Sequence, residues 1–258
     1  MRTILFAAAA IFLFAVQAFP QNYQTFNVDG VQRKAIIFAG AGKTKSSPVV
    51  FFFHGHGGNA DFAARRFRFH DAWKDAIVVY MEGIPGVGLI TDKEGVKNGW
   101  QNAPGTAGDR DLKFFDAVLK QLHKDYKVDD KRVYAAGFSN GARFVYVLWA
   151  ARGDKFAAFC AVAAPGGRLI QNAAPRSIWV SMGENDPIVP IRSQKASLNL
   201  VEELLDIDVR KGVSKGDTVT YKGRNDTELA VQIRKAGHQF PTDSISDIVA
   251  FFKRNTKH

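Results

Sequence analysis

The chain has 258 residues, of which 46% are hydrophobic and 23% are charged, and this composition excludes collagen-like, low-complexity and disordered proteins. Its formal net charge of +10 would suit an anionic partner. The basic residues are scattered, however, and no motif that reads nucleic acid accompanies them, so we expect no nucleic-acid partner.

The first residues have the pattern of a secretory signal peptide. Arg2 gives a positive start, Ile4 to Val16 form an apolar run, and Val16 and Ala18 are the small residues that a signal peptidase recognises. The run is shorter than the roughly 20 residues that cross a bilayer. We therefore expect cleavage after Ala18, a secreted or periplasmic protein without stable membrane anchoring, and a mature chain, residues 19–258, that forms one domain.

An antiparallel hairpin is predicted next. Asp29-Gly30 separates the strands Thr25–Val28 and Gln32–Phe38, and this dipeptide supplies the positive φ angles of a tight turn. Gly40 to Thr44 resembles the end of a phosphate-binding loop, but Ile37 stands where the first glycine of that motif belongs. This segment is therefore predicted to be a connector.

Short apolar runs then alternate with amphipathic segments. The expected strands are Val49–Phe53, Ile77–Met81, Val133–Phe138, Phe159–Ala163, Ile178–Met182 and Leu229–Ile233, and the expected helices are Leu112–Tyr126 behind a candidate N-cap at Asp109, Ala142–Ala151 and Ile245–Phe252. Most of these strands are apolar on both faces, which is typical of parallel strands covered by helices. The pattern predicts an α/β fold whose mostly parallel sheet has an antiparallel N-terminal hairpin and helices on both faces. Cys160, the one cysteine, is expected to be buried and inert.

Gly137-Phe138-Ser139-Asn140-Gly141 carries the strongest chemical signal. This G-x-S-x-G sequence joins an apolar strand to an apolar helix, and such a sharp turn lifts a serine hydroxyl clear of the sheet. We therefore predict that Ser139 is a nucleophile. The Asn140 amide, at the helix N-terminus, is predicted to stabilise a developing oxyanion.

A serine hydroxyl needs a base, and the base needs an acid that orients it. His238 follows the strand Leu229–Ile233 and is the predicted base. Asp186 follows the strand Ile178–Met182 and is the predicted acid, with Glu184 as its rival. The chain order of serine, acid and histidine is that of α/β-hydrolases.

A second oxyanion donor is predicted in the glycine-rich segment His54 to Asn59, which follows an apolar strand. The His56 amide is the first choice and the Gly57 amide the alternative. The two histidines of this segment lack a third ligand at a suggestive spacing, so no metal site is predicted there.

Together these motifs resemble the α/β-hydrolase serine esterases, and more narrowly the poly(3-hydroxybutyrate) depolymerase and feruloyl esterase group, similar to carbohydrate esterase family 1. The resemblance covers roughly residues 30 to 255. It implies that Ser139, Asp186 and His238 form a catalytic triad, with no metal or organic cofactor. Ala142-Arg143-Phe144 departs from the small or methionine-like residues usual after the serine motif, and no intrachain disulfide can form.

The expected function is that of an exported serine carboxylic-ester hydrolase acting through an acyl-enzyme. A small or oligomeric feruloyl, acetyl or hydroxyalkanoate ester is the expected substrate, since no polymer-binding module accompanies the domain. Trp100, within a long glycine-rich segment, is predicted to line the substrate pocket. A peptidase or acyltransferase on the same scaffold, or a non-catalytic binding protein, is the alternative.

Overall fold

The structure of the protein is a computed structural model that describes residues 22–257. The predicted signal peptide and its cleavage site lie outside these residues. Among the helices of residues 22–257, none is both long enough and apolar enough to cross a bilayer.

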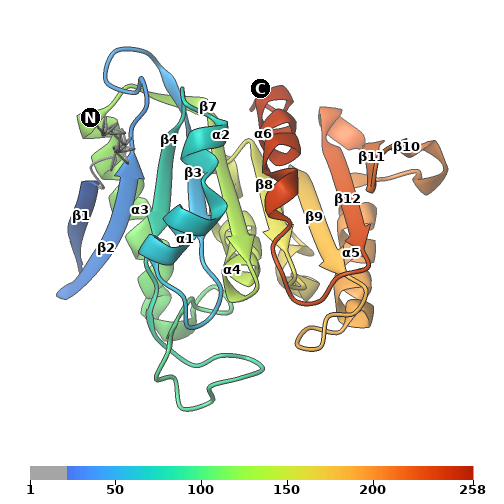
Figure 1. Ribbon diagram of the computed structural model, residues 1–258, viewed down its shortest axis with the longest axis horizontal. Coiled ribbons are helices and arrows are strands. Elements are labelled where there is room, and N and C mark those ends of the chain that lie inside the picture. Colours follow the sequence, from blue (N-terminus) through green and yellow to red (C-terminus); the bar gives the residue numbers. More distant parts are fainter. Residues whose placement is uncertain (1–21, 258) are drawn as a thin grey trace, which may run out of the picture.

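A ten-stranded sheet forms the centre of the molecule, with the strand order β1-β2-β4-β3-β7-β8-β9-β12-β11-β10 (Figure 1). Its strands are β1 (Asn22–Val28), β2 (Val31–Phe38), β3 (Ser47–Phe53), β4 (Ile77–Met81), β7 (Val128–Phe138), β8 (Ala158–Val162), β9 (Ser177–Gly183), β10 (Val213–Lys215), β11 (Thr218–Lys222) and β12 (Glu228–Arg234). The six strands from β4 to β12 in this order are parallel. The mostly parallel sheet that the sequence predicted is therefore confirmed.

Antiparallel strands form both edges of this sheet. The β1–β2 hairpin turns at Asp29 and Gly30, whose φ angles are 50° and 83°, as the sequence predicted. The opposite edge, β11 and β10, was not predicted. The residues of β10 are exposed and those of β11 mostly half-exposed, so these strands lack the apolar pattern by which the others were found.

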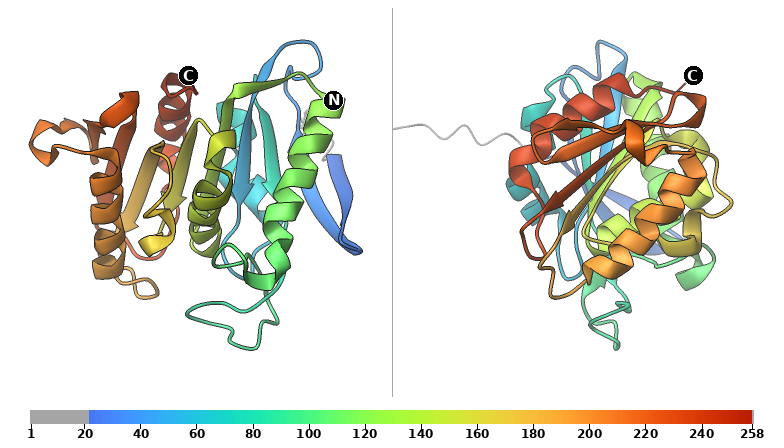
Figure 2. Two further views of the ribbon diagram at one scale, coloured as in Figure 1. Left: turned by 180° about the vertical axis from the view of Figure 1, so that it is seen from behind. Right: turned by 90° about the vertical axis from the view of Figure 1, so that its right-hand side faces the viewer.

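Helices cover both faces of the sheet, as Figures 1 and 2 show. One face carries α1 (Ala60–Phe67), α2 (Phe69–Ala72) and α6 (Ile245–Arg254), and the other carries α3 (Arg110–Asp125), α4 (Asn140–Arg152) and α5 (Ile191–Leu205). Because each face has its own apolar core, every residue of β3, β4, β8 and β9 is buried. Cys160 is completely buried in β8, and burial raises the pKa of its thiol.

Asp109 occupies the N-cap position of α3, as the sequence predicted, but its side chain makes no capping hydrogen bond. Its carboxylate instead accepts hydrogen bonds from Gly105 N at 2.7 Å and Gln101 Nε2 at 2.8 Å. Gln101 Oε1 instead accepts from the amides of Asp111 and Leu112, at 3.0 Å and 3.3 Å. A side chain distant in sequence therefore satisfies the first-turn amides that an N-cap normally would.

Candidate active site

The carboxyl ends of β3, β7, β9 and β12 lie at one end of the sheet, at the bottom of Figure 1. Ser139 stands there between β7 and α4, with φ 55° and ψ −121°. A positive φ in a residue other than glycine costs on the order of 1–3 kcal/mol. The turn is held by packing and by a 2.8 Å hydrogen bond from Ser139 N to Val162 O.

Two glycines allow this turn to pack against the sheet. A β-carbon at Gly141 would lie 2.1 Å from the carbonyl oxygen of Phe53, and one at Gly137 would lie 2.4 Å from the carbonyl oxygen of Gly141. Both distances are far below van der Waals contact. Because glycine has no β-carbon at either position, the first turn of α4 can pack directly against the ends of β3 and β7.

His238 and Asp186 lie beside Ser139. His238 Nε2 is 2.8 Å from Ser139 Oγ, and His238 Nδ1 is 2.8 Å from Asp186 Oδ2. This geometry fits a neutral imidazole that donates from Nδ1 and accepts the serine proton at Nε2. The structure thus brings together three side chains that lie far apart in sequence.

The Asp186 carboxylate is buried and well supplied with donors. Its Oδ1 accepts from the amides of Ile188 and Val189, at 2.9 Å and 2.8 Å. Burial alone would raise the pKa of Asp186, but the hydrogen bonds from Val189, His238 and Ile188 outweigh it and lower the pKa below the ordinary value. The rival acid, Glu184, is exposed, and among the described residues the carboxylate paired with His238 is that of Asp186.

His54 supports the loop that follows β3. Its ring is buried, Nδ1 donates to Gly55 O at 2.7 Å, and Nε2 accepts from Gly83 N at 2.9 Å. Burial lowers the pKa of His54 to about 4. The ring is therefore neutral near pH 7, and both of its nitrogens form hydrogen bonds with backbone groups.

We expect acidification from pH 7 to pH 4 to lower the free energy of unfolding, with a share of up to about 3 kcal/mol from His54. An unfolded histidine takes up its proton near pH 6.5, whereas folded His54 does so only near pH 4. The stabilisation is therefore present above pH 6.5 and lost as the pH falls toward 4. Urea denaturation at both pH values measures this loss.

A His54→Asn variant should lose less stability on acidification than the wild type. Part of the loss should persist, because burial also lowers the pKa of His70 to about 4. A His123→Asn variant is the control, since the His123 side chain is 40% exposed. An equal acid-induced loss in His54→Asn and wild type would contradict the expectation.

Two backbone amides near Ser139 have no acceptor. Within residues 22–257, neither the His56 amide nor the Asn140 amide donates a hydrogen bond. The alternative donor, Gly57, is occupied, because its amide donates to Asn98 O at 2.7 Å. His56 and Asn140 line the same pocket as Ser139. Each of these two amides therefore keeps an unused N–H donor beside Ser139.

The pocket at Ser139 has a volume of about 200 Å³. Its walls are mainly apolar and are formed by Leu89, Ile90, Ala164, Pro165, Ile188 and Val189. Polar groups are few, and the one cationic side chain among these lining residues is Arg143. Such a site suits a small organic substrate with an apolar body. Sequence reasoning found none of these walls, although Ile188 and Val189 directly follow Asp186.

Trp100 does not line this pocket, which corrects the sequence prediction. Its side chain is 2% exposed, its ring packs between Phe53 and Phe144, and its indole Nε1 donates to His54 O at 2.8 Å. Its backbone holds the Asn140 side chain, through a 2.7 Å bond from Trp100 N to Asn140 Oδ1. Trp100 therefore packs behind the site, where an apolar ring is better buried than exposed.

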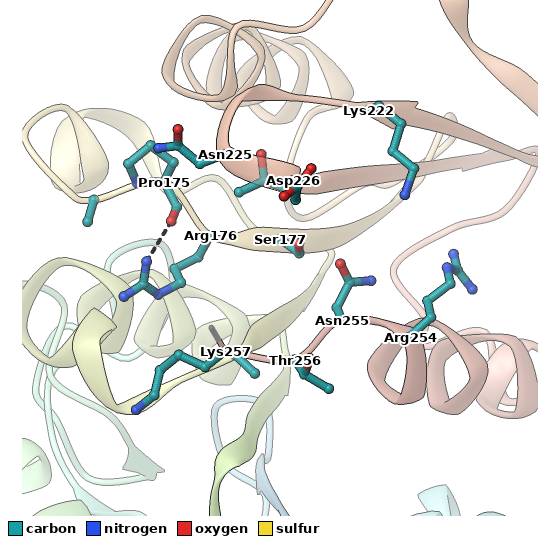
Figure 3. A pocket seen from close by; sticks show the side chains of 13 residues that line it. Pro175, Arg176, Ser177, Lys222, Asn225, Asp226, Arg254, Asn255, Thr256 and Lys257 are labelled. Atoms are coloured by element: carbon teal, nitrogen blue, oxygen red, sulfur yellow. Dashed lines mark hydrogen bonds between the residues drawn. The ribbon is translucent and has the colours of Figure 1, made fainter.

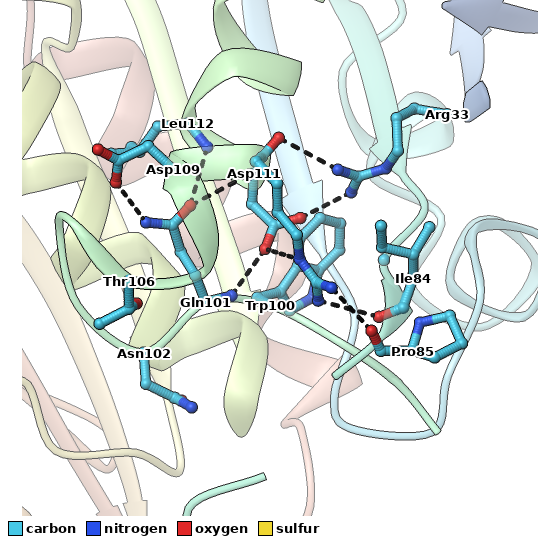
Figure 4. Close-up of polar contacts among 12 residues, drawn as sticks. Arg33, Ile84, Pro85, Trp100, Gln101, Asn102, Thr106, Asp109, Asp111 and Leu112 are labelled. Carbon is cyan, nitrogen blue, oxygen red and sulfur yellow. Dashed lines mark hydrogen bonds and ion pairs between the residues drawn. The ribbon is translucent and has the colours of Figure 1, made fainter. Parts of the chain in front are cut away.

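A buried polar network fixes the segment around Trp100. In Figure 4, Asp111 links the Arg33 guanidinium, at 2.7 Å, to the Gln101 amide, also at 2.7 Å. Arg110 donates to the carbonyls of Ile84 and Pro85, at 3.2 Å and 2.7 Å. This network ties the base of the loop between β4 and α3 to the first turn of α3.

Asp92, near the tip of that loop, contacts His56, which lines the pocket. The short strands β5 (Ile84–Pro85) and β6 (Asn98–Gly99) pair at its base. Asp92 Oδ2 accepts from Lys97 N and lies 2.8 Å from His56 Nε2. Asp92 therefore joins the loop to the predicted oxyanion segment, a role that no pattern in the sequence indicated.

No cluster of three or more His, Cys, Asp or Glu side chains within residues 22–257 is arranged to hold a metal ion. The two histidines after β3 have other partners: the His54 ring forms hydrogen bonds with backbone groups, and the His56 ring contacts the Asp92 carboxylate.

Comparison with known sequences finds esterases. Feruloyl esterase C of Emericella nidulans is 33% identical over 110 residues, which cover 41% of this chain and 38% of that protein. A bifunctional acetylxylan esterase/xylanase of Neocallimastix patriciarum is 26% identical over 165 residues, which cover 62% of this chain and 22% of that protein. The chain thus matches less than half of the length of these relatives. No family model matches it.

Solved structures show the class of fold. A CE1 ferulic acid esterase from Anaeromyces mucronatus superposes with a TM-score of 0.60 at 15% identity, covering 91% of this chain and 90% of that chain. The protein has the α/β-hydrolase fold. It resembles the feruloyl and acetylxylan esterases, and the resemblance expected from the sequence is thereby confirmed.

Proposed function

We propose that the protein is a serine carboxylic-ester hydrolase that acts through an acyl-enzyme on small feruloyl, acetyl or hydroxyalkanoate esters. The observation that carries the proposal is the chain of two 2.8 Å contacts from Ser139 Oγ through the His238 ring to Asp186. The chain begins in a pocket beside two amides that lack acceptors. The esterase relatives support the same chemistry.

The proposed reaction has two halves. His238 Nε2 removes the proton of Ser139 Oγ as the oxygen attacks the ester carbonyl, and Asp186 stabilises the imidazolium that forms. The amides of His56 and Asn140 donate to the tetrahedral oxyanion, each worth about 3 kcal/mol of transition-state stabilisation. His238 returns the proton to the leaving alcohol, and water then releases the acid by the same route.

Labelling with a fluorophosphonate, which reacts with activated serines, tests the proposal. We expect one covalent adduct per chain, located at Ser139 by mass spectrometry of the digested protein, and a burst of p-nitrophenol from p-nitrophenyl acetate. Prior incubation with the fluorophosphonate should abolish the burst. A protein that stays unlabelled and releases no p-nitrophenol would be a binding protein on a hydrolase fold. We also propose that the protein is exported, on the basis of its apolar leader.

A further inference from the structure

Arg143 is a pocket cation without an acidic partner. Its Nε donates to Asn102 O at 3.1 Å, and its Nη1 donates to the carbonyls of Pro165 and Gly166, at 3.1 Å and 2.7 Å. Within residues 22–257, no carboxylate oxygen lies within the 4.0 Å of an ion pair. Its charge is therefore held only by neutral carbonyl groups.

One edge of this guanidinium is open. An arginine carries five N–H donors, and the bonds above use one on Nε and two on Nη1. In the described part of the chain Nη2 makes no hydrogen bond, yet it is not among the buried polar atoms that lack a partner. Nη2 is thus not completely buried, and its two N–H groups have no acceptor within the described residues.

Arg143 lies one helical turn after Ser139. Arg143 belongs to the first turn of α4, and its amide donates to Ser139 O at 3.0 Å. Both residues line the 200 Å³ pocket. A group bound to Nη2 would therefore stand a few bonds away from an ester carbonyl at Ser139.

The two carboxylates next to the pocket-lining residues His56 and Val189 already have partners. Asp92 lies against His56 and two backbone amides, and Asp186 lies against His238. Burial lowers the pKa of Arg143, but an arginine keeps its charge in proteins. Arg143 thus presents a partly desolvated positive charge, a setting in which a carboxylate gives a strong, charge-assisted hydrogen bond.

We propose that Arg143 binds a carboxylate on the acyl part of the substrate, so that the preferred substrates are hemiesters of short dicarboxylic acids. Apolar walls accommodate the methylene chain, and Nη2 accommodates its anionic end. The inference rests on the proposed ester hydrolysis and makes Arg143 a specificity-determining residue.

A matched pair of esters tests this inference. Monomethyl glutarate and methyl 5-methylhexanoate have nearly the same shape, but only the first carries a carboxylate. We expect kcat/KM of the wild type to be at least about tenfold higher for monomethyl glutarate, since charged hydrogen bonds discriminate by this order. Raising the salt concentration should reduce the ratio.

Substitution of Arg143 should collapse the preference. We expect Arg143→Met to lower the glutarate-to-methylhexanoate ratio of kcat/KM at least about tenfold, to near one, mainly through KM for the anionic ester. Arg143→Lys should retain part of the preference for the anionic ester, because lysine keeps the positive charge. The rest should be lost, because lysine lacks the planar guanidinium that binds a carboxylate through two N–H groups.

Arg176→Met is the control. Arg176 also donates only to carbonyls, those of Gly153, Phe156 and Pro175. It lines a different pocket, formed where β9 begins, at the opposite end of the sheet from Ser139 (Figure 3). Both ester rates of this variant should match those of the wild type.

Each outcome decides between the inferences. A wild type that hydrolyses p-nitrophenyl acetate but does not prefer the glutarate overturns the role of Arg143 alone. An equal fall for both esters in folded Arg143→Met assigns Arg143 to holding its neighbouring loops, which also overturns the inference. If Arg143→Met does not fold, the wild-type ratio and Arg143→Lys decide. Failure to hydrolyse any ester overturns the proposed function itself.

Discussion

Replacing Ser139 with alanine is expected to lower kcat/KM for p-nitrophenyl acetate by about 10⁴-fold or more. The variant lacks the hydroxyl that lies 2.8 Å from His238 Nε2 and that is proposed to attack the ester. Alanine keeps the strained backbone, φ 55°, so the urea midpoint should match that of the wild type. Steady-state kinetics and urea denaturation measure both properties.

Ser193→Ala is the control for this substitution, because the exposed hydroxyl of Ser193 contacts only the carbonyl of Pro190. It should leave kcat/KM unchanged. Undiminished turnover by Ser139→Ala, in protein of normal stability, would remove Ser139 from the proposed mechanism.

Asp186→Asn is expected to cost about 10⁴-fold in kcat. The asparagine oxygen can still accept from the amides of Ile188 and Val189, so the loop should keep its shape. Its NH₂ group, however, cannot accept the Nδ1 proton of His238. The imidazole would then carry its proton on Nε2, where it can no longer accept the proton of Ser139. Kinetics at pH 7.5 measure the loss.

Glu184→Gln separates the two acids that the sequence offered. Glu184 is exposed, so this variant should retain wild-type kcat. If Glu184→Gln were the slower of the two variants, the orienting role would pass from Asp186 to Glu184.

The sequence predicted those parts of the protein in which local chemistry decides the structure. The strands β3, β4, β8 and β9 are apolar on both faces, and Asp29-Gly30 fits one kind of turn. Ser139, Asp186 and His238 follow the predicted strands β7, β9 and β12, and parallel strands end at the same edge of a sheet. Their grouping could therefore be expected from chain order, whereas their chemical roles stay predictions.

The rest depends on contacts between distant segments. Arg143 was noticed only as a departure from a family pattern, because its open edge results from the positions of Asn102, Pro165 and Gly166. Asp92 contacts His56 only because of the way the long loop between β4 and α3 folds. Trp100 was predicted to line the pocket, but its ring is buried against Phe53 and Phe144 and donates a hydrogen bond to the His54 carbonyl.

The loop that carries Leu89 and Ile90 has a practical consequence for protein engineering. Its apolar tip is more than half exposed at four positions, Val87, Leu89, Ile90 and Val96, and its base is anchored separately by Arg110 and the β5–β6 pair. The tip can therefore be randomised without disturbing the buried framework. A library restricted to these four codons would explore new acyl preferences at little risk to expression.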